Sequence, residues 1–261
     1  MTKKAFLVGL LAILAVAVHA QQKIISDNSF LIEEAYNQEK GVIQYISVLY
    51  RTRNGDFAYS FTNEFPVGGM RHQFSYTVQF VRVGTQVGFG DTFLNYRYQL
   101  HGMKEEDKVA IAPRFSVILP TGNFHHGAGT GAIGYQVNVP VSITHSKYFA
   151  THWNAGATLT PRARNTAGER ANTTGFNLGQ SSIYMPRHDF NVLFETVWNR
   201  NSTIASPGAT SHSYSLLLNP GIRWAYNFKN GLQIVPGLAV PFGVGPSYGE
   251  RGAFLYLSFE K

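Results

Sequence analysis

Apolar and polar residues alternate along much of this chain. Over residues 74–80, the apolar residues Phe74, Tyr76, Val78 and Phe80 are separated by Ser, Thr and Gln. The same alternation continues over residues 133–143, where every second residue is Ile, Tyr or Val. Because successive side chains of a strand point to opposite faces, this pattern predicts strands with one apolar and one polar face.

The pattern recurs often enough to predict about twelve strands in a closed antiparallel transmembrane β-barrel over residues 41–261. Besides the two segments above, strands are predicted at 94–100, 109–119, 153–159, 190–198, 214–228, 232–242 and 253–259, and with weaker alternation at 42–50, 57–65 and 175–184. Single-chain bacterial barrels have an even number of strands, so that both termini lie on the periplasmic side.

The composition of the two faces favours a membrane barrel over a soluble sandwich. A sandwich strand turns its apolar face inward and carries Lys and Glu on its outer face. In this chain the polar face carries Gln, Asn, Ser, Gly and isolated Arg, and the apolar face is rich in aromatics. This is the distribution expected of a polar lumen inside a lipid-facing wall.

The predicted connections alternate in length, as the loops of such barrels do. The outer connections are expected at 52–56, 82–91, 121–131, 161–174, 200–211 and 243–252, and the inner ones at 66–69, 101–108, 145–148, 186–189 and 229–231. Most outer connections are longer than their inner neighbours. The last strand ends with an aromatic residue, Phe259, which resembles the terminal signal read by the outer-membrane assembly machinery, displaced by Glu260 and Lys261.

The first twenty residues have the order of a secretory signal peptide. Lys3 and Lys4 precede an apolar run over residues 5–18 and a small-residue segment before Gln21. We therefore expect residues 1–20 to be removed on export to the outer membrane of a Gram-negative bacterium. Residues 21–40 lack alternation and contain a possible short helix at 30–36. They are expected either to form a periplasmic tail or cap, or to fold into the lumen and narrow it.

Composition supports a barrel and excludes some chemistry. Only 14% of the residues are charged, which is few for the surface of a soluble domain, and 26 are Gly. The chain has no Cys, so disulfides, thiolate metal sites and thiol catalysis are excluded. Loss of Lys3 and Lys4 with the signal peptide lowers the formal charge of +7 by two, to +5. The basic residues are spread along the chain, so no nucleic-acid partner is expected.

Six charged residues are predicted to line the lumen. By their place in the alternation they are Arg71, Arg97, Arg114, Arg223, Glu64 and Glu195. The arginines could pair with the acids across the interior and hold neighbouring strands together. Because the arginines outnumber the acids, they could also form a positively biased constriction that selects anions.

The remaining chemistry-bearing residues do not form a site in this pattern. His125 and His126 precede a Gly-rich stretch, but no helix follows it, so a dinucleotide site is not expected, and we expect no metal site or other cofactor. A barrel lipase would need a Ser activated by His and Asn. His152, Asn154 and Ser181-Ser182 supply the residue types, yet His152 has inward parity, so no enzyme activity is expected. Six aromatics are predicted to lie at the membrane interfaces: Phe190, Trp198, Trp224, Tyr226, Phe228 and Phe259.

Three short motifs resemble a known family. They are Gly88-Phe89-Gly90-Asp91, the segment from Phe115 to Gly122 that ends in Leu-Pro-Thr-Gly, and Phe194-Glu195. They are similar to the outer-membrane transporter-like family labelled as a component of the meta-pathway of phenol degradation, over nearly all of the mature chain. The resemblance implies a twelve-stranded barrel that passes small, aromatic or hydrophobic compounds, and it brings no site residues.

Passive transport of small solutes is therefore the predicted function. The alternative is a structural or adhesive surface protein that transports nothing, and a lipid-modifying enzyme is a remote third possibility. The predicted partners are the solute, outer-membrane lipids with lipopolysaccharide, and the assembly machinery.

Overall fold

The computed structural model describes residues 25, 27–104 and 106–261, so the predicted signal peptide lies outside the described residues. The chain forms sixteen strand segments in one antiparallel sheet. They are β1 (Gln44–Thr52), β2 (Phe57–Pro66), β3 (His72–Val83), β4 (Gln86–Phe89), β5 (Thr92–Tyr98), β6 (Val109–Ile111), β7 (Arg114–Leu119), β8 (Gly134–Ser146), β9 (Phe149–Arg164), β10 (Arg170–Arg187), β11 (Phe190–Ser206), β12 (Ala209–Trp224), β13 (Tyr226–Asn227), β14 (Gln233–Ala239), β15 (Phe242–Gly243) and β16 (Gly252–Glu260).

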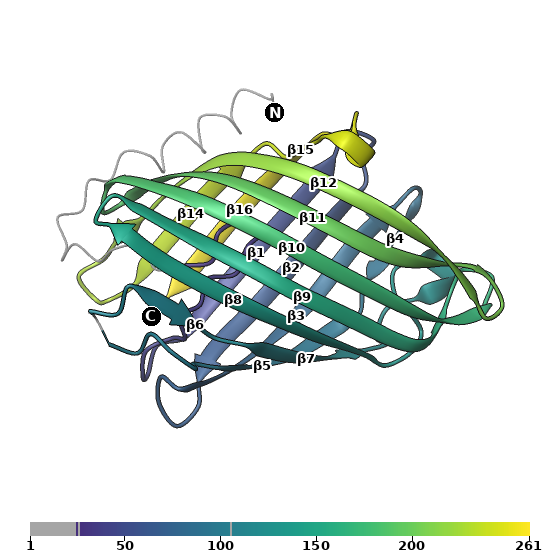
Figure 1. Cartoon of the computed structure of the whole chain (residues 1–261), viewed down its shortest axis with the longest axis horizontal. Helices are drawn as coiled ribbons and strands as arrows, with labels where there is room; N and C mark the ends of the chain where they lie inside the picture. The colour runs from purple at the N-terminus through teal and green to yellow at the C-terminus, as the bar shows by residue number, and fades with distance from the viewer. Residues whose placement is uncertain (1–24, 26, 105) are drawn as a thin grey trace, which may run out of the picture.

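These segments make a closed barrel of twelve strands (Figure 1), which confirms the predicted fold. Each of β4, β6, β13 and β15 is a short piece that continues a longer strand beside it in the sequence. The barrel closes because β16 pairs with β1 along the whole of β1, from Gln44 opposite Glu260 to Thr52 opposite Gly252. We call the end at which β1 begins and β16 ends the terminal end, and the other the opposite end.

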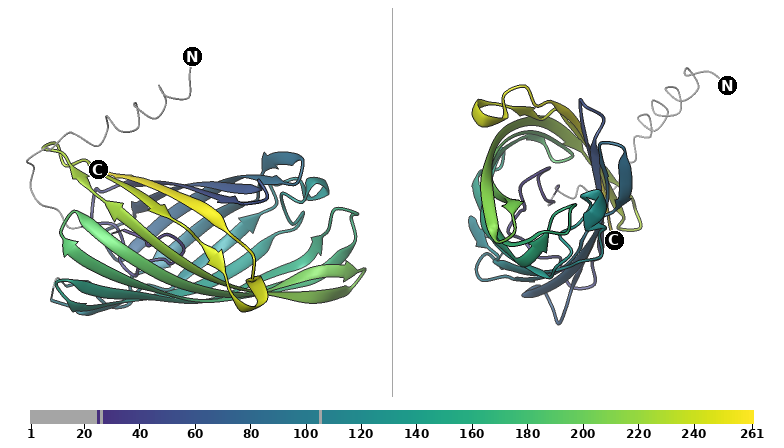
Figure 2. Two further views of the ribbon diagram at one scale, coloured as in Figure 1. Left: turned by 90° about the horizontal axis from the view of Figure 1, so that it is seen from above. Right: turned by 90° about the vertical axis from the view of Figure 1, so that its right-hand side faces the viewer.

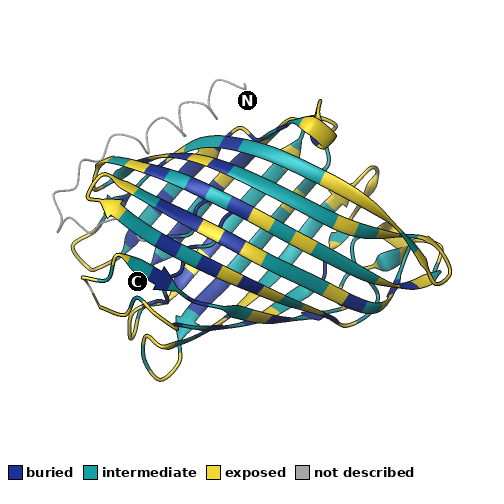
Figure 3. Cartoon of the chain, viewed as in Figure 1, coloured by how far each residue is buried: buried dark blue, intermediate teal, exposed yellow. Residues whose placement is uncertain are grey.

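The two faces of the wall differ as the alternation predicted. On β8, Val137 and Val139 are 49% and 42% exposed, whereas Asn138 between them is 3% exposed. The strands therefore show buried and exposed residues in turn along their length (Figure 3). Polar side chains fill the interior and apolar side chains cover the outside, the arrangement of a barrel that spans a bilayer.

The height of the apolar outer band fits a membrane. On β9, the exposed apolar residues extend from Phe149 to Leu159. These residues are about ten positions apart, which at about 3.3 Å per residue and about 40° of tilt corresponds to about 25 Å. This matches the height of the lipid-facing band in outer-membrane barrels.

Three of the expected long outer connections are wrong. The connection expected over 82–91 is reduced to residues 84 and 85, because β3 continues to Val83 and β4 begins at Gln86. The connection expected over 161–174 is reduced to 165–169, because β9 continues to Arg164 and β10 begins at Arg170. The connection expected over 200–211 is reduced to residues 207 and 208, between β11 and β12. The extensions of β9 to β12 lie beyond the apolar band and carry mostly polar or small residues, so the ladder continues although the sequence no longer alternates.

The N-terminal segment enters the barrel. Figure 2 shows the purple chain before β1 inside the ring of strands. Most of residues 27–38 are buried, and no helix forms at 30–36, contrary to expectation. Among the described residues no helix is long and apolar enough to cross a membrane. We call residues 27–38 the plug.

Candidate functional site

The plug contains no helix or strand, and six of its backbone amides donate to side chains of the wall. The amides of Leu31 and Ile32 donate to Glu195 Oε1 at 2.9 and 3.2 Å. The amide of Glu33 donates to Asn154 Oδ1 at 2.9 Å, and that of Ala35 to Ser142 Oγ at 2.8 Å.

The same pattern continues toward β1. The amide of Asn37 donates to Gln99 Oε1 at 2.8 Å, and that of Gln38 to Gln73 Oε1 at 2.7 Å. A buried backbone amide without a partner is costly, so these wall residues hold the segment in an extended path instead of a helix. The alternation predicted that these wall residues face inward, but it did not predict that they bind the plug.

Apolar side chains of the plug fit against glycines of the wall. The Phe30 ring lies 5.5 Å from Phe254 and 5.9 Å from Tyr256, centroid to centroid. A Cβ atom at Gly221 or Gly237 would overlap this ring. On the other side, a Cβ at Gly179 would overlap Ile32. The absence of side chains at these positions therefore makes room for the plug.

Arg97 binds the backbone of the plug. Its Nε donates to Asn37 Oδ1 at 2.8 Å, and its Nη atoms donate to the carbonyl oxygens of Glu34 and Tyr36 at 3.2 and 2.5 Å. Glu64 lies 3.8 Å away and supplies a countercharge. Arg97 thereby holds the plug with three hydrogen bonds.

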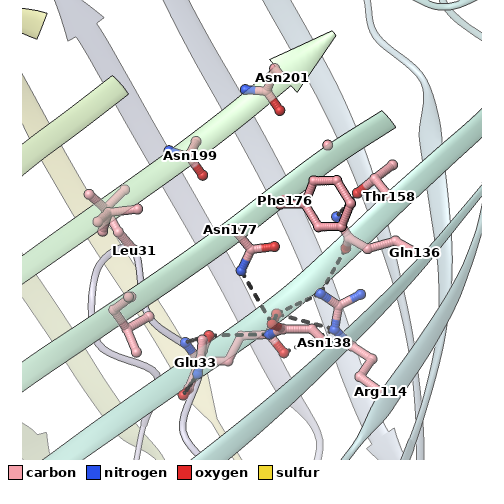
Figure 4. Close-up of a pocket in the computed structure, with 15 residues that line it drawn as sticks. Leu31, Glu33, Arg114, Gln136, Asn138, Thr158, Phe176, Asn177, Asn199 and Asn201 are labelled. Atoms are coloured by element: carbon pink, nitrogen blue, oxygen red, sulfur yellow. Dashed lines mark hydrogen bonds and ion pairs between the residues drawn. The ribbon is translucent and has the colours of Figure 1, made fainter. Parts of the chain in front are cut away.

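Arg114 forms the main ion pair between the wall and the plug. Its Nη2 lies 2.6 Å from Glu33 Oε1, and its Nε donates to Glu33 Oε2 at 2.9 Å, so the contact is bidentate. Nη2 also donates to Gln136 Oε1 at 2.9 Å. Figure 4 shows this pair beside Asn138, whose amide donates to Glu33 Oε1 at 3.1 Å.

Arg223 and Asp27 hold the first residues of the plug. Arg223 Nη1 donates to the carbonyl oxygens of Asp27, at 3.0 Å, and of Asn28. The Asp27 carboxylate accepts hydrogen bonds from Gln44, Ser258 and Tyr256, with the Gln44 bond at 2.8 Å. Strands β1, β12 and β16 therefore converge on one residue.

The lumen holds more acids than the sequence-based count predicted. The sequence-based count included Glu64 and Glu195 as the only inward acids. Among the described residues, the interior also holds Glu260 of β16 and three acids of the plug, Asp27, Glu33 and Glu34. The three interior arginines, Arg97, Arg114 and Arg223, are thus matched or outnumbered by carboxyl groups.

Burial changes how readily the acids of the plug ionise. Desolvation and, second, the neighbouring Asp27 raise the pKa of Glu34 to about 8. For Glu33, burial acts in the same direction, but Arg114, together with Arg97 and a hydrogen bond from Asn138, outweighs it and lowers the pKa of that carboxyl. The Glu33–Arg114 contact is therefore ionic at neutral pH.

Arg71 does not lie with the other predicted lumen residues. It is exposed at the beginning of β3, where its guanidinium lies 5.9 Å from the centroid of the Tyr98 ring and donates to the Tyr98 hydroxyl at 3.2 Å. Alternation fails for this residue because it lies before the first residue of the strand. Glu64 and Glu195 are both buried, at 7% and 0% exposure.

Three of the residues considered for a lipase-like site, His152, Asn154 and Ser181, face the interior, whereas Ser182 lies on the outward face of β10, opposite the exposed Phe194. Ser181 and His152 are paired across β10 and β9, but the Ser181 hydroxyl accepts from Ser29 of the plug at 2.9 Å. Asn154 donates to the Glu33 carbonyl at 2.8 Å. The three inward residues line the plug's path and not the lipid-facing surface where such an enzyme acts.

A cavity of about 250 Å³ lies on the opposite-end side of the plug. Leu31, Ile32 and Glu33 form its floor. The polar residues of its wall are Arg114, Gln136, Asn138, Asn154, Thr158, Asn177, Asn199 and Asn201. The cavity is therefore lined mainly by neutral amides, with one ion pair at its base (Figure 4). We call it the vestibule.

Two of the three motifs behind the family resemblance meet in space at the opposite end. Asp91 Oδ1 accepts from the amide of Gly122 at 3.0 Å, and its Oδ2 accepts from the amide and the hydroxyl of Thr130, both at 2.8 Å. This carboxylate closes the 121–131 loop onto β5. In the third motif, Glu195 accepts hydrogen bonds from the plug, so this motif residue contributes to the candidate site.

Comparison with known proteins shows the same fold. No family model and no curated protein matches the chain. Among solved structures, the COG4313 outer membrane channel from Pseudomonas putida F1 has a TM-score of 0.62 at 11% identity, over 87% of this chain and 97% of that chain. The KdgM porin has a TM-score of 0.52 at 12% identity, over 83% of this chain and 97% of that one. The NanC porin has a TM-score of 0.51 at 9% identity, over 83% and 98%. The chain therefore has the barrel fold of outer-membrane porins and channels.

Proposed function

We propose that this protein is a channel of the Gram-negative outer membrane through which small solutes pass passively, and that the plug restricts its lumen. One observation carries this proposal: the polar interior contains an open vestibule that ends at a segment held only by side-chain contacts. Such contacts can be exchanged for water at a smaller cost than a strand of the wall, so the obstruction is removable while the barrel stays closed. The porins and channels with a similar barrel support the same function.

The vestibule suits neutral polar solutes. Amide groups offer both donors and acceptors, and they match hydroxyl, amide or carbonyl groups of a solute without requiring a charge. Arg114 is neutralised by Glu33, so a preference for anions has little support. Passage of aromatic or hydrophobic compounds rests on the family resemblance and on the apolar floor residues Leu31 and Ile32.

A liposome swelling assay tests this function. Proteoliposomes are diluted into isotonic solutions of small neutral sugars, aromatic acids and aliphatic acids, and the rate of swelling is compared with that of protein-free liposomes. We expect swelling for the smallest neutral solutes, with rates that fall as solute size increases. No swelling with any solute, for the complete chain and for a chain that lacks residues 27–38, would favour the structural or adhesive alternative.

A further inference from the structure

A basic cleft opens on the outer surface of the barrel, away from the lumen. It has a volume of about 410 Å³ and lies at the opposite end of β8, β9 and β10. The residues that define the basic cleft are Arg162, Arg164, Arg170, Ile133, Tyr135 and Pro161. Ile133 and Tyr135 are 48% and 43% exposed, which identifies the side of the wall on which the cleft lies.

A β-bulge in β9 sets the direction of the Arg162 side chain. Between the pairs Thr160–Thr173 and Ala163–Ala171, strand β9 has two residues where β10 has one. Arg162 occupies this bulge with a φ of 54°, and it is the only residue other than Gly with positive φ among those described. Its amide donates to Asn172 Oδ1 at 2.9 Å. β-Bulges change the direction of side chains, and residues with a strained φ of this kind are concentrated at functional sites.

The other two arginines are placed directly opposite each other. Arg164 of β9 pairs with Arg170 of β10 across the ladder. Like charges in this position destabilise a sheet. Among the described residues, none of the ion pairs involves an arginine of the cleft. The guanidinium of Arg164 lies 5.2 Å from the centroid of the Phe124 ring, which orients it but does not neutralise it. An anion bound between Arg164 and Arg170 would relieve the repulsion between them.

The cleft lies at the height of lipid headgroups. The last exposed apolar residues below it are Tyr135 on β8, Leu159 on β9 and Phe176 on β10. These residues end the apolar band, and the arginines follow within a few positions on β9 and β10. A cation in this position meets the phosphate groups of the membrane surface.

We propose that the basic cleft binds a phosphate group of a phosphorylated glycolipid in the outer leaflet. The three guanidinium groups bind the phosphate oxygens, and Ile133 and Tyr135 contact the beginning of the acyl chains. Arginine suits this task because its planar fork donates two parallel hydrogen bonds to a phosphate. The site is independent of whether the lumen conducts.

Native mass spectrometry of the detergent-purified protein tests this proposal. The probes are bisphosphorylated lipid A, the same lipid after removal of its phosphates, and inorganic phosphate. We expect retention of one bisphosphorylated lipid and little retention of the other probes. The triple variant Arg162→Gln/Arg164→Gln/Arg170→Gln should bind on the order of a hundredfold more weakly, from about a factor of five per arginine near a charged surface.

A matched variant controls for overall charge. Arg53→Gln/Arg82→Gln/Arg251→Gln removes the same charge from other exposed residues near the opposite end, and should bind as tightly as the wild type. Heat-modifiable gel mobility reports whether each variant has folded. If the triple variant does not fold, the single change of the exposed Arg162→Gln replaces it. Equal weakening by both triple variants, equal retention of the dephosphorylated lipid, or displacement by inorganic phosphate at similar concentration would overturn the proposal.

Discussion

Glu33 and Arg114 link the plug to the wall through a charge on each side. The pair lies at the base of the vestibule, where a solute would meet it. An arginine that loses its carboxylate in a confined polar space stays charged and attracts anions. The selectivity of the lumen therefore depends on a contact between two segments that are far apart in the sequence.

Changing Glu33→Gln should shift the selectivity of the lumen toward anions. Reversal potentials in a KCl gradient should shift toward the chloride equilibrium potential, because Arg114 becomes uncompensated. Glu39→Gln removes the same charge from an exposed residue beyond the plug and should shift the potential little. The double change Glu33→Gln/Arg114→Gln should return the potential toward that of the wild type. Equal shifts for Glu33→Gln and Glu39→Gln would show that the pair does not set the selectivity.

Val139 tests the outer face at mid-height of the band. Val139→Arg should destabilise the folded protein in liposomes by about 2–4 kcal/mol, since the residue faces the hydrocarbon. Asn138 is unsuitable as the inward control, because it is buried and bonded to Glu33 and Asn154. Asn177→Arg is the better control, since it lines the vestibule. Denaturant titrations that give equal losses for the two variants would contradict the assignment of the faces.

Residue positions could be predicted from the sequence only as far as the alternation extends. It placed Arg97, Arg114, Arg223, Glu64 and Glu195 correctly inside, because each lies within a strand that has one apolar face. It failed for Arg71, which precedes its strand. It also could not provide the acids of the plug, since a segment without alternation gives no face to which its residues can be assigned.

At the scale of elements, the plug is held by features of the wall that have no sequence signature. Gln, Asn, Ser and Glu side chains on β3, β8, β9 and β11, and directly after β5, accept hydrogen bonds from its backbone, but in the sequence they are ordinary lumen residues. Gly221 and Gly237 accommodate Phe30, yet a glycine in a barrel strand can equally mark a bulge or a bend of the wall. The path of the plug therefore emerges only when the strands are assembled.

Filling the space for Phe30 should release the plug. Gly237→Leu places a side chain where the Phe30 ring lies, and should expose the segment. Because the chain has no Cys, a single Ser29→Cys change allows its accessibility to be measured with a hydrophilic maleimide. Labelling should be slow in the Ser29→Cys protein and faster by an order of magnitude or more when Gly237→Leu is added, since about 2 kcal/mol of lost contact corresponds to about 30-fold.

Two further variants decide whether the effect is specific. Adding Phe30→Ala to Gly237→Leu restores a fit between the two sides, and should slow the labelling again. Gly88→Leu has no atoms near its side chain and should leave the labelling rate unchanged. Fast labelling of Ser29→Cys without any other change would mean that the plug does not occupy the lumen.

The orientation of the barrel in the membrane can be tested at the turns of its two ends. Gly168 lies in the turn between β9 and β10 at the opposite end, and Asn230 lies in the turn before β14 at the terminal end. A protease-cleavable tag inserted at Gly168 should be cut on intact cells, and one at Asn230 should be cut only after the outer membrane is permeabilised. Insertion is tolerated best at such exposed turns. The reverse pattern of cleavage would invert the topology.

Single-channel conductance in planar bilayers tests the central claim, that residues 27–38 restrict an otherwise passable lumen. The complete protein should show a small conductance, and a variant that lacks these residues should show a conductance several-fold larger, since pore conductance rises with the open cross-section. Heat-modifiable mobility confirms that the shortened chain forms a barrel, and Gly237→Leu, which keeps every plug residue, should change the conductance in the same direction. Equal conductance of the complete and shortened proteins would contradict the claim.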